Sequence, residues 1–135
     1  MNATRTEQDM IGSLQVPADA YYGIHSLRAA ENFPITGQHL SRQMIESLGW
    51  IKKACARANL AAGTIREDVS RAIEQACDEI IAGRLHDQFI VDPIQGGAGT
   101  STNMNANEVI ANRAIEILGG KKGDYTLVNP NDDVN

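Results

Sequence analysis

The segment Gln95–Asn105 combines residue types that can bind a small anion. It reads Gln-Gly-Gly-Ala-Gly-Thr-Ser-Thr-Asn-Met-Asn, so a glycine-rich turn passes directly into hydroxyl and amide residues. Glycines let backbone N–H groups turn toward one point, and the free amides at a helix start add partial positive charge. No lysine follows the loop, unlike in the phosphate-binding pattern G-x-x-x-x-G-K-[ST]. The loop therefore predicts a site for a small carboxylate, with a simple turn and a Ser/Thr helix cap as the other interpretation.

The elements that must position this loop are predicted by the apolar spacing. We expect a mainly α-helical domain with helices near residues 26–32, 42–61, 67–82 and 102–118, Gly/Asn-rich loops between them, and an irregular segment over residues 1–23. A short extended stretch is expected near residues 13–16. Ser41 is the expected N-cap of the second helix, and Thr64-Ile65-Arg66-Glu67 has the form of a capping box for the third. Gly63 and Gly83 follow the ends of these two helices.

Composition limits the classes of partner. The 135 residues are 42% hydrophobic and 21% charged, and the net charge of −5 argues against nucleic acid or an anionic membrane as a partner. No segment approaches the roughly 20 apolar residues that span a bilayer. The N-terminus carries Glu7 and Asp9 and does not resemble a secretory signal. We therefore expect a cytoplasmic protein.

The cysteines and histidines give no pattern typical of a metal centre. Cys55 and Cys77 have no Cys-x-x-Cys spacing, and we expect small reduced residues, with a structural disulfide as the other possibility. His25, His39 and His86 show no ligand spacing with cysteines or carboxylates. No metal and no cofactor are expected.

Five blocks of the chain resemble the aspartase/class II fumarase superfamily. Gln95–Asn107 is similar to the family signature, and the other four blocks stand in family order: Val16–Gly23, His25–Phe33, Asp87–Asp92 and Asn129–Asn135. The motif Gly-Gly-Ala-Gly-Thr-Ser is similar to the one in aspartate ammonia-lyases, whereas fumarases more often carry Ser-Ser before Gly-Thr. The chain is therefore identified as resembling aspartase first and class II fumarase second.

The resemblance implies both a fold and an activity. Residues 1–135 would form the N-terminal domain of the fumarase/aspartase fold, without the central helical bundle and the C-terminal domain. The full-length protein would be a homotetramer that reversibly eliminates ammonia from L-aspartate to give fumarate. The family's serine base lies in a Gly-Ser-Ser-x-Met-Pro motif that is absent here. No catalytic residue is therefore expected in this chain, and it should be inactive alone. A non-catalytic helical domain that binds a carboxylate is the alternative from another class.

The resemblance also assigns roles to residues in the loop. By analogy with the family, Thr100 helps to hold the substrate carboxylate next to the carbon that loses a proton. Gly99, Ser101 and Asn103 are its expected partners in substrate binding. Asn107 follows Asn103 by four residues and shares its helix face, where it would either bind ligand or form a packing seam.

Further site residues are implied more indirectly. Asn129, Asn131 and Asp132 match a second carboxylate site of fumarases, although His stands there in place of Asn129, and an Asx-type turn is the other interpretation. Arg28 and Lys52 are expected to support activity indirectly. For Arg28 the alternative is a surface or interdomain salt bridge, and for Lys52 it is a solvated helix face.

Overall fold

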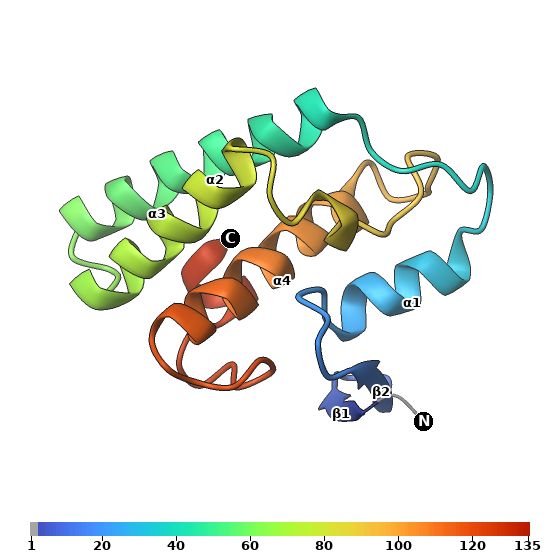
Figure 1. The fold of residues 1–135 in the computed structure, drawn as a ribbon, viewed down its shortest axis with the longest axis horizontal. Coiled ribbons are helices and arrows are strands. Elements are labelled where there is room, and N and C mark those ends of the chain that lie inside the picture. The colour runs from blue at the N-terminus through green and yellow to red at the C-terminus, as the bar shows by residue number, and fades with distance from the viewer. Residues whose placement is uncertain (1–2) are drawn as a thin grey trace.

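The computed structural model describes residues 3–135, which are mainly helical, as predicted (Figure 1). The elements in chain order are β1 (Thr4–Gln8), β2 (Ser13–Pro17), α1 (Ile24–Asn32), α2 (Arg42–Ala61), α3 (Glu67–Ile81), a 3₁₀ turn (His86–Gln88), α4 (Thr100–Ile117) and a final helical turn (Pro130–Val134). All four helices expected from the apolar spacing are present, and no end is shifted by more than two residues.

Helix α4 lies at the centre of the fold. The α2–α3 hairpin packs on one side of it, and α1 with the β-hairpin lies on the other (Figure 1). The core between α3 and α4 contains Ile73, Ile80, Val109 and Ile110, all fully buried. Because α4 is covered on several sides, its polar side chains are buried as well, and they must find partners inside the protein.

The helix ends agree with the sequence at α2 but not at α3. The Ser41 hydroxyl accepts a hydrogen bond from the Met44 N–H at 3.2 Å, which confirms the predicted N-cap. The capping box predicted at Thr64 was wrong. The Thr64 hydroxyl donates instead to the carbonyl of Asn59, one of the free carbonyls at the end of α2, and α3 begins only at Glu67.

The N-terminal segment forms an antiparallel hairpin, in register from Thr4 opposite Pro17 to Gln8 opposite Ser13. The extended stretch expected near residues 13–16 is confirmed as β2, but β1 was not predicted. Arg5 on β1 holds the segment in place, since its guanidinium donates to the carbonyls of Pro17 at 2.9 Å and of Tyr22 at 2.8 Å. One charged side chain thus fixes a strand that has little apolar pattern of its own.

The structure also bears on the two cysteines and on the expected lack of a membrane-spanning segment. Cys55 and Cys77 are both free, so they form no disulfide, and burial raises the pKa of the Cys77 thiol to about 12. Within residues 3–135, no helix is both long and apolar enough to cross a membrane.

Candidate functional site

The glycine-rich loop curls over the start of α4 through three consecutive left-handed residues. Gly97, Ala98 and Gly99 have φ angles of +87°, +54° and +88°. Glycine adopts this region freely, but Ala98 does so at a cost of about 1 kcal/mol. Such strain at a loop that meets a helix start is typical of a functional turn.

The loop leaves two amides of α4 open. Gly99 is the N-cap and has no side chain, and Thr100 does not act as a cap, because its hydroxyl donates to the Gly97 carbonyl at 2.8 Å. The first bond inside the helix runs from the Asn103 N–H to the Gly99 carbonyl. Among residues 3–135, the N–H groups of Ser101 and Thr102 have no hydrogen-bond partner. The positive end of α4 is therefore available to an anion.

Two depressions flank the start of α4. A groove of about 550 Å³ lies toward α2 and is lined by Gly99 and Asn103, among others. A smaller depression of about 230 Å³ lies toward α1 and is lined in part by Thr100 and Ser101. The structure thus brings the four predicted substrate-binding residues to one junction, but it divides them between two faces.

Lys52 reaches this junction from α2. Its side chain is buried, and its Nζ donates to Oδ1 of Asn103 at 2.7 Å and to Oδ1 of Asn135 at 3.3 Å. Within residues 3–135 it forms no ion pair with a carboxylate, and burial lowers the pKa of its ammonium group. The solvated-face interpretation is therefore wrong for Lys52, whereas the neighbouring Lys53 pairs with Asp78 at the surface.

Asn103 and Asn107 share a helix face, as expected. The amides of both side chains donate to Oδ1 of Asn135, at 2.9 and 3.3 Å. Two buried side-chain atoms in the described part of the chain have no partner, Oδ1 of Asn107 and Oε1 of Gln95. Gln95 precedes α4 and Asn107 lies about two turns inside it, so each leaves one buried hydrogen-bond acceptor unused.

Comparisons with known proteins identify the family of this chain. A family model described as lyase matches residues 12–135. The chain belongs to this lyase family. The aspartate ammonia-lyase of Bacillus subtilis is 60% identical over 131 residues, and the class II fumarate hydratase of Halobacterium salinarum is 56% identical over the same length. Each alignment covers 97% of this lyase chain but only 28% of the relative.

Solved structures of the family have the same fold. A fumarate lyase:delta crystallin from Brucella melitensis, bound to cobalt, superposes with a TM-score of 0.97 at 52% identity, over 98% of this lyase chain and 29% of the other. A class II fumarase from Schistosoma mansoni gives a TM-score of 0.91 at 37% identity, over 98% and 28%. The predicted family and fold are thereby confirmed. Within residues 3–135, no group of three potential metal ligands is found.

The segment proposed as a second carboxylate site forms an Asx-type turn. Oδ1 of Asn129 accepts hydrogen bonds from the backbone N–H of Asn131 at 2.8 Å and of Asp132 at 3.1 Å. The Asp133 carboxylate closes the turn by accepting from the Asn129 N–H. The side chain of Asn129 is thus engaged within the chain itself, and a carboxylate site at these residues stays a prediction.

Arg28 lies on α1 and forms a two-point ion pair. Its Nε and Nη2 donate to the Asp9 carboxylate at 2.7 and 3.0 Å, and Nη2 also donates to the Gly12 carbonyl. The guanidinium holds the pKa of Asp9 down at about 2. Arg28 therefore ties α1 to the hairpin turn, and it also lines the depression that contains Thr100.

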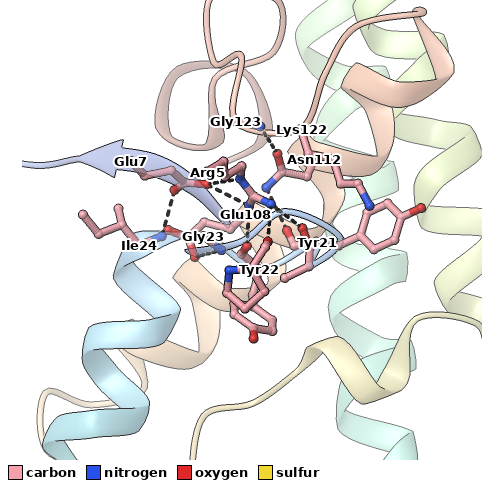
Figure 2. A network of polar contacts seen from close by, with 12 residues as sticks. Arg5, Glu7, Tyr21, Tyr22, Gly23, Ile24, Glu108, Asn112, Lys122 and Gly123 are labelled. Carbon is pink, nitrogen blue, oxygen red and sulfur yellow. Dashed lines mark hydrogen bonds and ion pairs between the residues drawn. The ribbon is translucent and has the colours of Figure 1, made fainter. Parts of the chain in front are cut away.

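A buried carboxylate that was not predicted from the sequence, Glu108, caps α1 from α4 (Figure 2). Its Oε2 accepts from the N–H of Gly23 at 2.8 Å and of Ser26 at 3.1 Å, and its Oε1 accepts from the N–H and from Nδ1 of His25, both at 2.9 Å. Burial by itself would raise the pKa of Glu108, but the hydrogen bonds from His25 and Ser26 outweigh it and lower the pKa. The only sign of this role in the sequence was the position of Glu108, which lies among the inward-facing residues of a helix that is otherwise buried.

A second carboxylate completes the capping of α1. Oε2 of Glu7 accepts from the Ile24 N–H at 2.9 Å, and the Tyr125 hydroxyl donates to the same carboxylate. A Cβ atom on Gly23 would lie 2.4 Å from the Tyr125 hydroxyl oxygen and 2.8 Å from Oε2 of Glu7. Only glycine fits at this point, where the two carboxylates approach the same helix start.

Proposed function

We propose that this chain is the N-terminal domain of an aspartate ammonia-lyase, which converts L-aspartate to fumarate and ammonia. The open start of α4 is the observation that carries the proposal. The amides that begin α1 are taken up by Glu7 and Glu108, whereas those of Ser101 and Thr102 have no partner among residues 3–135. The similarity to several aspartate ammonia-lyases supports the substrate.

The open amides suit the difficult step of such an elimination. Removal of a C–H proton next to a carboxylate builds up negative charge on the carboxylate oxygens. Donors that are already aimed at those oxygens lower the barrier, and one such donor contributes roughly 3 to 4 kcal/mol. We infer that the amides of Ser101 and Thr102 supply fixed donors. The Thr100 hydroxyl, which now donates to Gly97, adds a donor that can rotate onto substrate.

Lys52 and Asn103 provide the electrostatic background of the proposed site. A buried ammonium group without a carboxylate partner makes the potential in the adjoining groove more positive. Its hydrogen bond holds the Asn103 side chain in place at the groove wall. Gly99 has no side chain, so a ligand can approach the backbone closely there. The burial of Lys52 and its hydrogen bond to Asn103 support the indirect role that the family resemblance implies for this lysine.

The remaining chemistry is proposed to lie outside this chain. A central helical bundle and a C-terminal domain, assembled as a cytoplasmic homotetramer, would supply the serine base and the other walls of the pocket. The chain spans 28% of the length of the curated relatives, so these parts have room in a full-length protein. We therefore expect the 135-residue chain to show no turnover by itself.

The test is fumarate formation, followed by ultraviolet absorbance, with L-aspartate and L-malate as substrates. The enzyme is the parent protein that continues past Asn135, and the 135-residue chain is the control. Turnover of aspartate by the parent alone is the expected result. Turnover of malate instead would make the parent a class II fumarase, an alternative favoured by the 56% identity to the Halobacterium enzyme. A parent that is inactive on both would indicate a domain that binds carboxylates without catalysis.

A further inference from the structure

Asp92 is a buried carboxylate in the segment that leads into the glycine-rich loop. It is only 5% exposed, and its hydrogen-bond donors among residues 3–135 are backbone amides and a hydroxyl, without a cation. Burial by itself would raise the pKa of Asp92, but the hydrogen bonds from the surrounding amides, first that of Ile94, outweigh it and lower the pKa to about 2. A buried ionised carboxylate is costly unless donors surround it, so its contacts fix the segments that supply those donors.

The first of these segments is the linker between α1 and α2, residues 33–41. Oδ2 of Asp92 accepts from the N–H of Thr36 at 2.7 Å and of Gly37 at 2.9 Å, and the Thr36 hydroxyl donates to Oδ1 at 2.9 Å. Within residues 3–135, every hydrogen bond that joins residues 34–40 to a segment outside the linker goes to Asp92. The position of the linker therefore depends on this one side chain.

The second segment is the entrance to the glycine-rich loop. Oδ1 of Asp92 also accepts from the Ile94 N–H at 2.8 Å. The Asp92 carbonyl accepts from Nε2 of Gln95 at 2.9 Å, and the same Nε2 donates to the Thr102 hydroxyl, in the first turn of α4, at 2.9 Å. Asp92 therefore connects the linker to both the loop and the start of α4.

The linker and the loop supply different parts of the wall of the α2-side groove. Leu40 and Ser41 come from the end of the linker, and Pro93 and Ala98 come from the segment before α4. The linker passes beside this segment (Figure 1). Asp92 is not among the residues that line the groove, yet it provides the hydrogen bonds between these two parts of its wall.

We propose that Asp92 is a positioning residue for the elimination, because it holds the linker against the glycine-rich loop and so sets the width of the α2-side groove. The proposal rests on the proposed function, and Asp92 itself neither contacts the substrate nor transfers a proton. The groove wall contacts the substrate in its ground state as well as in the transition state. Loosening the wall should therefore weaken substrate binding more than it slows the chemical step.

Steady-state kinetics of the parent protein with L-aspartate test the proposal. An amide offers one acceptor oxygen where the carboxylate offers two, so Asp92→Asn should raise KM about tenfold and change kcat by less than about twofold. A merely structural role would reduce the amount of active enzyme, which lowers the apparent kcat and leaves KM unchanged. Asp87→Asn is the matched control, because Asp87 is exposed and accepts only from the neighbouring Gln88 among residues 3–135. It should keep both values.

Thr36→Val is a milder change that keeps the charge of Asp92. Thr36 is exposed, so the variant should fold, and it loses only the hydroxyl donor to the carboxylate. Its KM should rise by about two- to threefold, the effect of one of several hydrogen bonds. Thr126→Val, which removes a hydroxyl contact to Asp124 in a surface turn, should leave KM unchanged. If Asp92→Asn does not fold, an unchanged KM in Thr36→Val overturns the proposal.

Amide hydrogen exchange gives a second readout that needs no turnover. In the Asp92→Asn variant of the 135-residue chain, the amides of Thr36, Gly37 and Ile94 should exchange about tenfold faster, because each loses a charged acceptor or shares a weaker one. Equal exchange in the variant and the unchanged chain would overturn the positioning role. An active parent whose KM for L-aspartate is unchanged in Asp92→Asn would overturn this proposal alone, whereas a parent without turnover would refute the ammonia-lyase proposal together with it.

Discussion

The backbone N–H of Gly23 donates a 2.8 Å hydrogen bond to Oε2 of Glu108, which lies 85 residues farther along the chain. This contact joins the start of α1 to the middle of α4. Glu108 follows Thr100 by about two turns of the same helix. The position of α1, and with it one wall of the Thr100 depression, is therefore tied to the helix that carries the candidate site.

Replacing Glu108 by Gln should destabilise the chain by about 2 to 4 kcal/mol. An amide offers only one oxygen to the donors of Gly23, His25 and Ser26, and buried donors that lose a charged acceptor are costly. The free energy of unfolding in urea measures the effect. Glu46→Gln, which removes a surface pair with Arg42, should change it by less than about 1 kcal/mol. Equal losses in both variants would contradict the capping role.

Gly23→Ala should reduce the unfolding free energy even though it adds a single methyl group. The new Cβ would overlap the Tyr125 hydroxyl oxygen at 2.4 Å and the Glu108 side chain at 2.9 Å. Gly96→Ala is the matched control, because its Cβ would meet Phe33 at an ordinary 3.6 Å. Thermal unfolding of the two variants should therefore differ clearly in midpoint. Similar midpoints would mean that the capping network yields at little cost.

Lys52→Met should separate stability from activity. The ammonium group is buried without a carboxylate partner, so an apolar side chain of similar length should change the unfolding free energy by less than about 1 kcal/mol. Turnover of aspartate by the parent protein should nevertheless fall by about tenfold or more, because the site loses a fixed positive charge. Lys53→Met, on the same helix but paired with Asp78, should keep normal turnover. A fully active Lys52→Met parent would leave Lys52 without a functional role.

Thr100→Ala in the parent protein should lower kcat by roughly a hundredfold, the usual effect of losing one donor to a developing oxyanion. Thr100→Ser keeps the hydroxyl and should restore most of the rate. Steady-state kinetics with L-aspartate distinguish the two variants, and circular dichroism confirms that both fold. If alanine and serine reduced kcat equally, the threonine methyl group rather than the hydroxyl would be the important feature.

Stability should depend on pH through the His25–Glu108 pair. The pKa of His25 is raised above 6.5 by its bond to Glu108, so its contribution is complete below 6.5 and is lost as the pH rises through the folded-state value. The pKa of Glu108 is lowered from 4.5, so its contribution is lost only as the pH falls through that lowered value. Urea unfolding across this range should show lower stability on the alkaline side. The variant His25→Gln should flatten that alkaline decrease, and an unchanged slope would exclude His25 as its origin.

Local patterns in the sequence predicted the helices well, because apolar spacing and the Ser41 cap act within a few residues. The loop was also placed correctly, since its glycines are required by the left-handed backbone at Gly97 and Gly99. Its neighbour Lys52 was anticipated only through family resemblance. Nothing in the spacing shows that this lysine turns inward to Asn103 while Lys53 turns outward.

The predictions that failed depend on partners distant in sequence. β1 is held by Arg5 and by pairing with β2, not by an apolar pattern, so the segment looked irregular. Thr64 had a suitable spacing for a capping box, but the end of α2 offered its hydroxyl a nearer acceptor. The capping of α1 by Glu108 joins residues that only the folded chain brings together, and no window of local sequence contains both.

The shared capping of α1 has a consequence for building chimeric proteins from this family. Glu7, Gly23 and Glu108 come from three separate segments, yet they form one structural unit around a single helix start. A recombination crossover placed between α1 and α4 would separate the helix from its cap. Hybrids with such a crossover should fold only when both parents carry this same combination, so the three positions set the rule for choosing compatible parents.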